Sequence, residues 1–242
     1  MDADPADLLA LLELQKVESA IDRLVHRRDS LSEQVKLDDS REVLDTVDRA
    51  CAEKDAEMIE VSRGRTRLET ELDHFSQKIA HEEKRLFGGN ITAAKELSSI
   101  QAEVEALKRR RTRLEDDLLE VMEAQEALEH EVAALRARQD RLREGVGELE
   151  VARDRALAEI GAQLEMEEKA RGEQVPKIPQ DLTDLYKELR RHKGGVGAAA
   201  YVDGTCQGCH LALPPLERER IKTAKGLVRC EQCGRILVVV SS

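Results

Sequence analysis

Two pairs of cysteines near the end of the chain are the residues best suited to chemistry. Cys206 and Cys209 form one CxxC pair, and Cys230 and Cys233 form a second pair after twenty intervening residues. Two residues between cysteines let both thiolates reach one ion from a tight turn, so the two pairs supply four ligands. Four thiolates fill a tetrahedral shell and leave no open position. The spacing therefore predicts one structural Zn²⁺ per chain.

Three other chemistries share parts of this cysteine pattern. Iron in a rubredoxin-like site has the same ligand set, so iron stays open as an alternative metal. The string Cys206-Gln-Gly-Cys209-His210 also spells the haem c attachment motif, but haem attachment leaves the second pair unexplained. A redox CxxC pair is the third alternative, which two pairs flanked by strands disfavour. The fifth cysteine, Cys51, is interpreted as a small core hydrophobe.

The residues around the cysteines predict a small ribbon of three or four strands. Residues 198–202 are β-like, and residues 235–240 form a short apolar strand after the last cysteine. A short amphipathic helix over 181–192 precedes them. Some 40 residues cannot bury much core, so metal binding must supply much of the folding free energy, on the order of 10 kcal/mol or more.

The elements that carry this ribbon are long helices with a heptad seam. Apolar residues recur in alternating steps of four and three over residues 93–163, and again over 51–86 and 14–35. Such a repeat far exceeds an ordinary globular helix and predicts a coiled coil. A few seam positions are polar, which weakens the seam but specifies register. These are Arg28, Lys54, Arg65, Glu82, Arg111, Gln125, Gln139, Arg153 and Gln163.

A turn and a phase slip interrupt this helical part. Phe87-Gly88-Gly89-Asn90-Ile91-Thr92 combines a Gly-Gly helix stop with Asn90 or Thr92 as the next cap. Two similar amphipathic helices around a short turn predict an antiparallel hairpin, rather than a parallel bundle with other chains. The seam loses its phase near Leu37-Asp38-Asp39-Ser40, a run of poor helix formers, so local unwinding or a bend is expected near 36–42.

The predicted fold is mainly α: a long antiparallel coiled-coil helical hairpin with a small C-terminal β zinc ribbon. The expected division places the hairpin in residues 1–175, with its turn near 87–92. The short helix and four-cysteine ribbon occupy residues 176–242. The boundary follows from Val175-Pro176-Lys177-Ile178-Pro179, because proline cannot continue a helix.

The composition agrees with a rod and a metal-stapled ribbon. Charged residues make up 37% of the 242 residues and aromatics only 2%, so a thick globular core is disfavoured. No window approaches the apolar length of a membrane span, and the acidic N-terminus lacks signal-peptide features. A cytoplasmic location without membrane partners is expected. The six histidines are scattered, and no nucleophile elbow, phosphate loop or HExxH occurs, so neither an enzyme nor a small-molecule substrate is predicted.

The ending of the chain resembles the bacterial C4-type zinc ribbon family, whose members carry a long helical hairpin ahead of the ribbon. The matching segments are Cys206-x-x-Cys209, Cys230-Glu-Gln-Cys233-Gly234-Arg235-Ile236-Leu237, Lys95-Glu96-Leu97, Ile178-Pro179, Leu185-Tyr186 and Leu189-Arg190. The resemblance spans essentially the whole chain. It implies a non-enzymatic cytosolic protein with regulatory or adaptor roles through protein partners and nucleic acids, in which Cys206, Cys209, Cys230 and Cys233 carry the metal.

Charge is divided unevenly along the chain. Residues 177–242 hold 11 Lys+Arg against 7 Asp+Glu, whereas residues 1–176 hold 28 against 43. A mobile basic loop between the cysteine pairs could neutralise phosphates, while the acidic hairpin would repel a duplex alongside it. The candidate nucleic-acid-binding residues are Arg190, Arg191, Lys193, Arg218, Arg220, Lys222, Lys225 and Arg229.

Two functions fit these features. The first is a zinc-binding regulatory adaptor whose coiled coil binds protein partners, with RNA or DNA contact at the basic ribbon. The heptad seam of the hairpin contains polar residues that the opposite helix need not pair with, so an amphipathic helix of another protein could pack there. The alternative is a dedicated nucleic-acid-binding protein that uses the ribbon, with the hairpin as a spacer.

Overall fold

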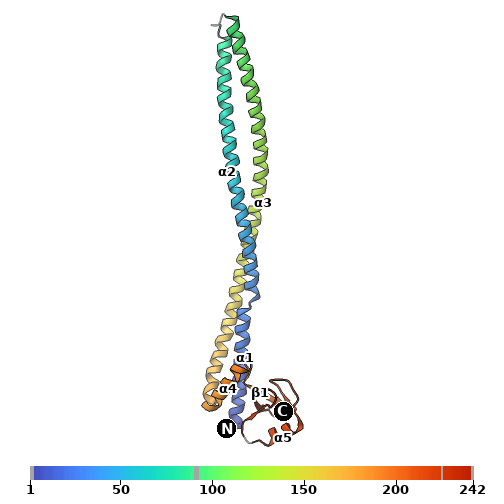
Figure 1. Cartoon of the computed structure of the whole chain (residues 1–242). Helices are drawn as coiled ribbons and strands as arrows, with labels where there is room; N and C mark the ends of the chain where they lie inside the picture. Colours follow the sequence, from blue (N-terminus) through green and yellow to red (C-terminus); the bar gives the residue numbers. More distant parts are fainter. Residues whose placement is uncertain (1–2, 90–92, 225, 241–242) are drawn as a thin grey trace. The chain divides into compact units, whose positions relative to one another are not determined.

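The computed structural model describes residues 3–89, 93–224 and 226–240. The fold is mainly α with a small C-terminal sheet, which confirms the predicted class (Figure 1). Its elements, in chain order, are α1 (Pro5–Asp29), α2 (Ser32–Phe87), α3 (Ala94–Gln174), the 3₁₀ turn η1 (Val175–Lys177), α4 (Gln180–His192), β1 (Ala198–Val202), β2 (Thr205–Cys206), α5 (Pro215–Thr223), β3 (Val228–Arg229) and β4 (Ile236–Val239).

The chain forms two compact units. One comprises Met1–Val35 with Leu149–Ser242, and the other is Lys36–Glu148. We call the first the ribbon unit and the second the hairpin unit. The boundary predicted near residue 175 does not coincide with this division, because α1 packs against the ribbon rather than belonging only to the hairpin.

The hairpin unit pairs α2 with α3 in antiparallel fashion, as predicted. Ion pairs join Lys54 to Glu131 at 2.9 Å, and Lys78 to Glu103 at 3.4 Å. Exposed pairs of this kind contribute little free energy, so the apolar seam must supply most of the stability. Buried seam residues of this unit are Cys51, Ile79, Ile100, Val104, Leu107, Leu114, Leu128 and Val146. Cys51 is a free, buried seam residue, consistent with its interpretation as a core hydrophobe.

The turn lies where the glycines predicted it. Helix α2 ends at Phe87, α3 begins at Ala94, and Gly89 adopts a left-handed φ of 74° that favours glycine. The caps expected at Asn90 and Thr92 lie outside the described residues.

The local unwinding predicted over residues 37–40 is wrong. Helix α2 is continuous from Ser32, and the break lies at Ser30 and Leu31. The Ser30 backbone N–H and side-chain hydroxyl both donate to the His26 carbonyl, which ends α1. Val35, predicted in the seam, is 58% exposed, whereas Leu37 is fully buried and begins the seam of α2. The phase slip is therefore taken up between Leu31 and Leu37; the bend expected near 36–42 stays a prediction.

The ribbon sheet has four strands in the order β2-β1-β4-β3. Strand β1 runs parallel to β4, with Ala198 opposite Ile236, and the outer strands are antiparallel to their neighbours. Because side chains alternate across a strand, each face of the sheet contributes to a different core. Ala198, Ile236 and Val238 face one cluster, and Ala199, Tyr201 and Leu237 face the other.

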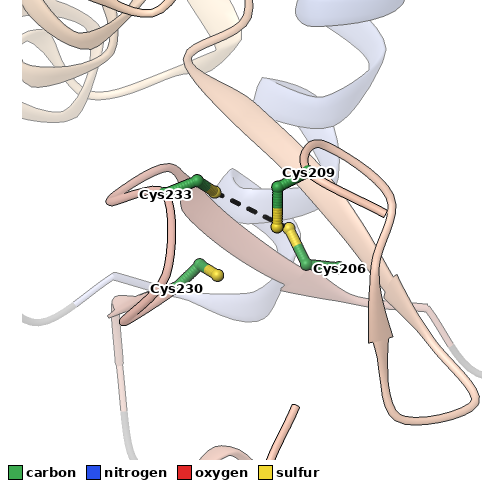
Figure 2. A group of neighbouring side chains, drawn as sticks. All are labelled: Cys206, Cys209, Cys230 and Cys233. Atoms are coloured by element: carbon green, nitrogen blue, oxygen red, sulfur yellow. Dashed lines mark hydrogen bonds between the residues drawn. The ribbon is translucent and has the colours of Figure 1, made fainter. Parts of the chain in front are cut away.

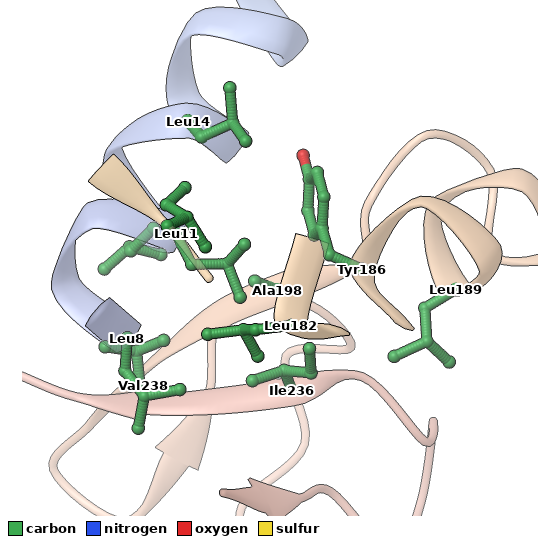
Figure 3. Packing of buried hydrophobic residues seen from close by; sticks show 11 residues of the cluster. Leu8, Leu11, Leu14, Leu182, Tyr186, Leu189, Ala198, Ile236 and Val238 are labelled. Atoms are coloured by element: carbon green, nitrogen blue, oxygen red, sulfur yellow. The ribbon is translucent and has the colours of Figure 1, made fainter. Parts of the chain in front are cut away.

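The first of these clusters joins α1, α4 and the sheet, and we call it the neck core (Figure 3). Its buried members are Leu8, Leu11, Leu12, Leu14, Ile178, Leu182, Tyr186, Leu189, Ala198, Ile236 and Val238. Gln15 is buried beside it and is fully used: its amide oxygen accepts from Gly197 N–H at 2.7 Å, and its amide nitrogen donates to the Gly195 carbonyl. A Cβ at Gly197 would lie 2.7 Å from the Tyr186 ring, so this close approach requires glycine.

Tyr186 also ties α4 to α1 through a polar contact. Its hydroxyl donates to Glu18 at 2.6 Å, and Arg190 bonds to Glu18 and Asp22. Burial, followed by the hydrogen bond to the Glu18 carboxylate, raises the pKa of Tyr186 well above its usual value. The Tyr186 phenol is therefore held as a neutral hydrogen-bond donor in the neck core.

Helix α5 replaces the mobile basic loop expected between the cysteine pairs. Its first residue is Pro215, which suits the first turn of a helix, and Ile221 is buried in the second cluster. The apolar side chain anchors the segment to the sheet, so the loop prediction is wrong here.

Candidate metal centre

The sheet brings all four cysteines of the two pairs together. Cys206 ends β2, Cys230 follows β3, and Cys209 and Cys233 lie in the turns after them. All four sulfur atoms lie within 4.8 Å of one another, and the Sγ atoms of Cys206 and Cys233 are 3.9 Å apart (Figure 2). Cys206 and Cys233, 27 positions apart in sequence, thus belong to one compact group of sulfur atoms.

The two CxxC turns have the same construction. In the first, His210 N–H donates to the Cys206 carbonyl at 2.7 Å, and in the second, Gly234 N–H donates to the Cys230 carbonyl at 2.7 Å. Both donors adopt left-handed φ values, 59° at His210 and 75° at Gly234. The residue after each pair therefore closes the turn through its backbone. His210 serves this purpose with its side chain exposed.

The protein environment acts on the thiols in opposite directions. Burial raises the pKa of Cys206 to about 12 and also raises the pKa of Cys230. Burial acts in the same sense on Cys233, but hydrogen bonds from the backbone and side chain of Arg235 and from neighbouring cysteines lower its pKa to about 7. Backbone N–H groups thus already favour thiolate at one corner of the cluster.

This sulfur cluster fits a zinc ion. With Zn–S bonds of about 2.3 Å, a tetrahedral shell needs sulfurs about 3.8 Å apart, close to the observed Cys206–Cys233 distance. All donors are sulfur, which suits a closed structural site rather than a catalytic one. The four-thiolate hypothesis predicts that both CxxC pairs meet at one point. Haem attachment does not explain this arrangement.

Comparison with protein families agrees with both parts of the fold. A model described as the CT398-like coiled coil hairpin domain matches residues 14–194, and a C4-type zinc ribbon model matches residues 205–237. The chain belongs to the CT398-like coiled-coil hairpin family. The resemblance inferred from the cysteine motif is confirmed. The family match begins after Leu8, Leu11 and Leu12 of the neck core.

Relatives of this CT398-like chain match along nearly its whole length. The uncharacterized proteins Rv2229c and MT2288, from two strains of Mycobacterium tuberculosis, are each 29% identical over 240 residues, 98% of this chain and 97% of theirs. A solved structure from Mycobacterium smegmatis has a TM-score of 0.86 at 31% identity and covers 99% of this chain and 100% of its own. CT398 from Chlamydia trachomatis has a TM-score of 0.70 at 21% identity, covering 97% and 98%, and shows the shared fold alone.

The basic residues predicted for nucleic acid are in varied environments in this CT398-like ribbon unit. Arg190 is held by Glu18 and Asp22, and Arg218 donates to the Leu213 carbonyl at 2.6 Å, so these two have internal roles. Lys193 is half-buried, and Lys225 lies outside the described residues. The exposed members are Arg191, Arg220, Lys222 and Arg229, of which Arg220 pairs with Glu231 and Lys222 with Glu219.

Glu217 is a residue near the metal centre that sequence reasoning missed. Its side chain is buried, and its Oε1 accepts from Glu231 N–H at 3.0 Å, inside the second CxxC turn. Its Oε2 is buried without a hydrogen-bond partner among the described residues. The only signal in the sequence is its position in α5 one turn before Ile221, which shares the buried side of that helix.

We expect Glu217→Ala to weaken zinc retention by about 10-fold, because outer partners that orient ligands commonly contribute 10- to 100-fold in affinity. Competition with a chromogenic chelator measures this directly. Glu219→Ala is the matched control, since Glu219 lies on the exposed side of the same helix and pairs with Lys222. Glu217→Gln keeps the acceptor oxygen and should retain near-normal affinity. Equal zinc loss in the Glu217→Ala and Glu219→Ala variants would contradict the assignment.

No helix within the described ranges of the chain combines the length and apolar character that a membrane crossing needs.

Proposed function

We propose that this chain is a non-enzymatic, zinc-binding regulatory adaptor. Cys206, Cys209, Cys230 and Cys233 hold one Zn²⁺ per chain, and the hairpin binds protein partners. The zinc, when bound, supplies a structural cross-link between the two CxxC turns. The closed donor set supports a structural rather than a catalytic role, because four thiolates leave no position for water or substrate.

The observation that carries the adaptor proposal is the apolar surface left uncovered on the hairpin unit. Phe87, one of only two phenylalanines in the chain, is 81% exposed at the end of α2, and Leu119 is 58% exposed on α3. Exposed aromatic side chains are common anchors of protein interfaces.

Nucleic-acid contact at the ribbon is the second part of the proposal. The exposed residues Arg191, Arg220, Lys222 and Arg229 support it, since lysine and arginine neutralise phosphates. The described ribbon offers few aromatic rings for stacking on bases: Tyr186 and Tyr201 are both buried. Binding there would depend on charge rather than sequence. A dedicated nucleic-acid-binding protein with the hairpin as spacer is the alternative function.

Affinity capture with the tagged full-length protein separates the two functions. We expect captured proteins to survive nuclease treatment and to be lost by at least about 10-fold from the double variant Phe87→Ser with Leu119→Ser, because one or two interface anchors often contribute more than 1.4 kcal/mol each. Quantitative mass spectrometry of the captured material measures the effect. Both residues are exposed, so these changes should not unfold the chain.

The control is Arg220→Gln with Lys222→Gln, which alters the ribbon and leaves the hairpin unchanged. If capture depends on nuclease-sensitive material and is lost only in this ribbon variant, the adaptor function is overturned in favour of the nucleic-acid-binding alternative.

A further inference from the structure

The hairpin unit carries two arginine-rich stripes, one on each of its helices. On α2, a shallow groove is lined by Arg63, Thr66, Arg67, Thr70, Glu71 and His74. On α3, a second groove is lined by Ala106, Arg109, Arg110, Arg113, Leu114 and Asp117. Within each set the residues are mostly three or four positions apart, so each set forms one stripe along its helix.

Contacts across the hairpin place the two stripes on the same side. Arg110 of α3 bonds to Glu71 of α2 at 3.4 Å, and its guanidinium lies 5.4 Å from the centre of the Phe75 ring. Helices α2 and α3 run beside each other through this region (Figure 1). We call the combined surface the arginine face, defined by Arg63, Arg67, Arg109, Arg110 and Arg113.

The arginine face has an excess of positive charge, although the whole chain has a formal net charge of −11. Two carboxylates, Glu71 and Asp117, line its two grooves beside five arginines, and Arg63 also pairs with Glu60 at 2.6 Å. Arg109 reaches Glu105 only at 3.7 Å, in an exposed pair of the kind that contributes little. Among the described residues, Arg67 and Arg113 make no ion pair at all. The exposed guanidinium groups of Arg67 and Arg113 are therefore free to bind an anion.

The residue types specify what kind of anion fits. Every cation on the arginine face is arginine, whose planar fork of five N–H donors matches a phosphate in bidentate fashion. Arginines one turn apart on a helix repeat about every 5.4 Å, so several can follow a chain of phosphates. Arg110 lies over one face of the Phe75 ring, so that face is not open for stacking on a base. Recognition by such a surface depends on the backbone of the ligand and not on its bases.

We propose that the arginine face binds the phosphate backbone of a nucleic acid without reading its sequence. The acidic total charge of the hairpin predicts the opposite, namely repulsion of a duplex. That expectation treats the charge as uniform, whereas the structure gathers arginines on one side of the hairpin. The site comprises residues 63–117 only and is separate from the basic residues proposed on the ribbon.

The test measures binding of full-length protein to a short single-stranded RNA and to a DNA duplex, both of mixed sequence, across a salt series. Arg67→Gln with Arg113→Gln should lower affinity for at least one probe by about 10-fold at low salt. It should also reduce the slope of log K against log salt by about 1.4 for the single strand or about 1.8 for the duplex, because two phosphate contacts are lost. The two probes show which form of nucleic acid the surface prefers.

The matched control is Arg23→Gln with Arg27→Gln, which removes the same charge from two exposed arginines four positions apart on α1. It should leave affinity and slope nearly unchanged. Equal losses in both double variants would reduce the effect to net charge and overturn the proposal. Salt-independent binding by the wild type would also overturn the proposal. A third contrary result is that polyglutamate displaces the RNA as readily as polyphosphate does while Arg67 and Arg113 are still required, because this would indicate an acidic protein partner. If only the ribbon variant Arg220→Gln with Lys222→Gln loses binding, the arginine face is excluded while the proposed ribbon contact stands.

Discussion

Replacement of Cys230 by serine should abolish zinc binding and unfold the four-stranded ribbon, while most of the helical signal survives. A serine hydroxyl is a poor zinc ligand, and structural zinc sites contribute on the order of 10 kcal/mol to folding. On the face of the sheet that carries the cysteines, only Ala199, Tyr201, Leu213, Ile221 and Leu237 of the described residues are buried beside them, so this face depends on the metal for its stability. Metal analysis of purified protein should fall from about one zinc per chain, the number that four thiolates fill, to near zero.

Spectroscopy separates the ribbon from the hairpin in this experiment. The chain has two tyrosines, Tyr186 and Tyr201, and both are buried in the ribbon unit. The near-ultraviolet circular dichroism of Tyr201, which packs in one cluster with Cys206 and Cys230, should be lost in the Cys230→Ser variant, whereas the far-ultraviolet helical signal from α2 and α3 should persist. Cys51→Ser is the matched control, because Cys51 is buried in the seam of α2, and its zinc content should stay normal. Unchanged zinc in Cys230→Ser, or haem absorbance in the wild type, would refute the four-thiolate site.

Leu11→Ala should destabilise the ribbon unit by about 2–5 kcal/mol, the range for a buried leucine that leaves a cavity. Leu11 has 0% exposure and packs in the neck core between α1 and the sheet. With a denaturant slope of about 2 kcal/mol per molar urea, the unfolding midpoint should fall by roughly 1–2.5 M. Urea titration followed by the tyrosine signal measures this loss in the ribbon unit.

Leu9 provides the control for this prediction, since it lies on the same helix and is 47% exposed. Leu9→Ala should shift the midpoint much less, because a half-exposed side chain leaves no closed cavity. If the two variants lose stability equally, α1 does not hold the ribbon unit together in solution.

The docking of α1 on the ribbon is one part of the fold that sequence reasoning missed. A signal was present: Leu8, Leu11, Leu12 and Gln15 share one helix face, in addition to the seam residues Leu14 and Ile21. A helix with two apolar faces must bury both of them. The sequence alone does not say what covers the second face, because the covering residues, such as Tyr186 and Ile236, lie about 170 or more positions away.

In the candidate site, the sequence predicts the cysteines but not the residues around them, for the same reason. The CxxC spacing predicts the group Cys206, Cys209, Cys230 and Cys233, because two-residue spacing is a local signature. The structure brings all four sulfur atoms together. Glu217 was missed, since its contact with Glu231 depends on how α5 docks on the sheet. Arg190 and Arg218 are predicted to contact nucleic acid, yet in the folded chain Arg190 pairs with Asp22 and Arg218 donates to the Leu213 carbonyl.

Spacing along the chain was sufficient for the hairpin, the turn at Gly88-Gly89 and the grouping of the four cysteines, because heptads, turns and CxxC pairs are short-range patterns. Long-range packing settled the rest: the position of the helix break at Ser30, the docking of α1 on the ribbon, and the gathering of arginines on one side of an acidic hairpin. These features depend on which faces meet when distant segments pack. A pattern of apolar and charged residues predicts that a face will be covered or charged, but only the packed chain shows which partner lies opposite it.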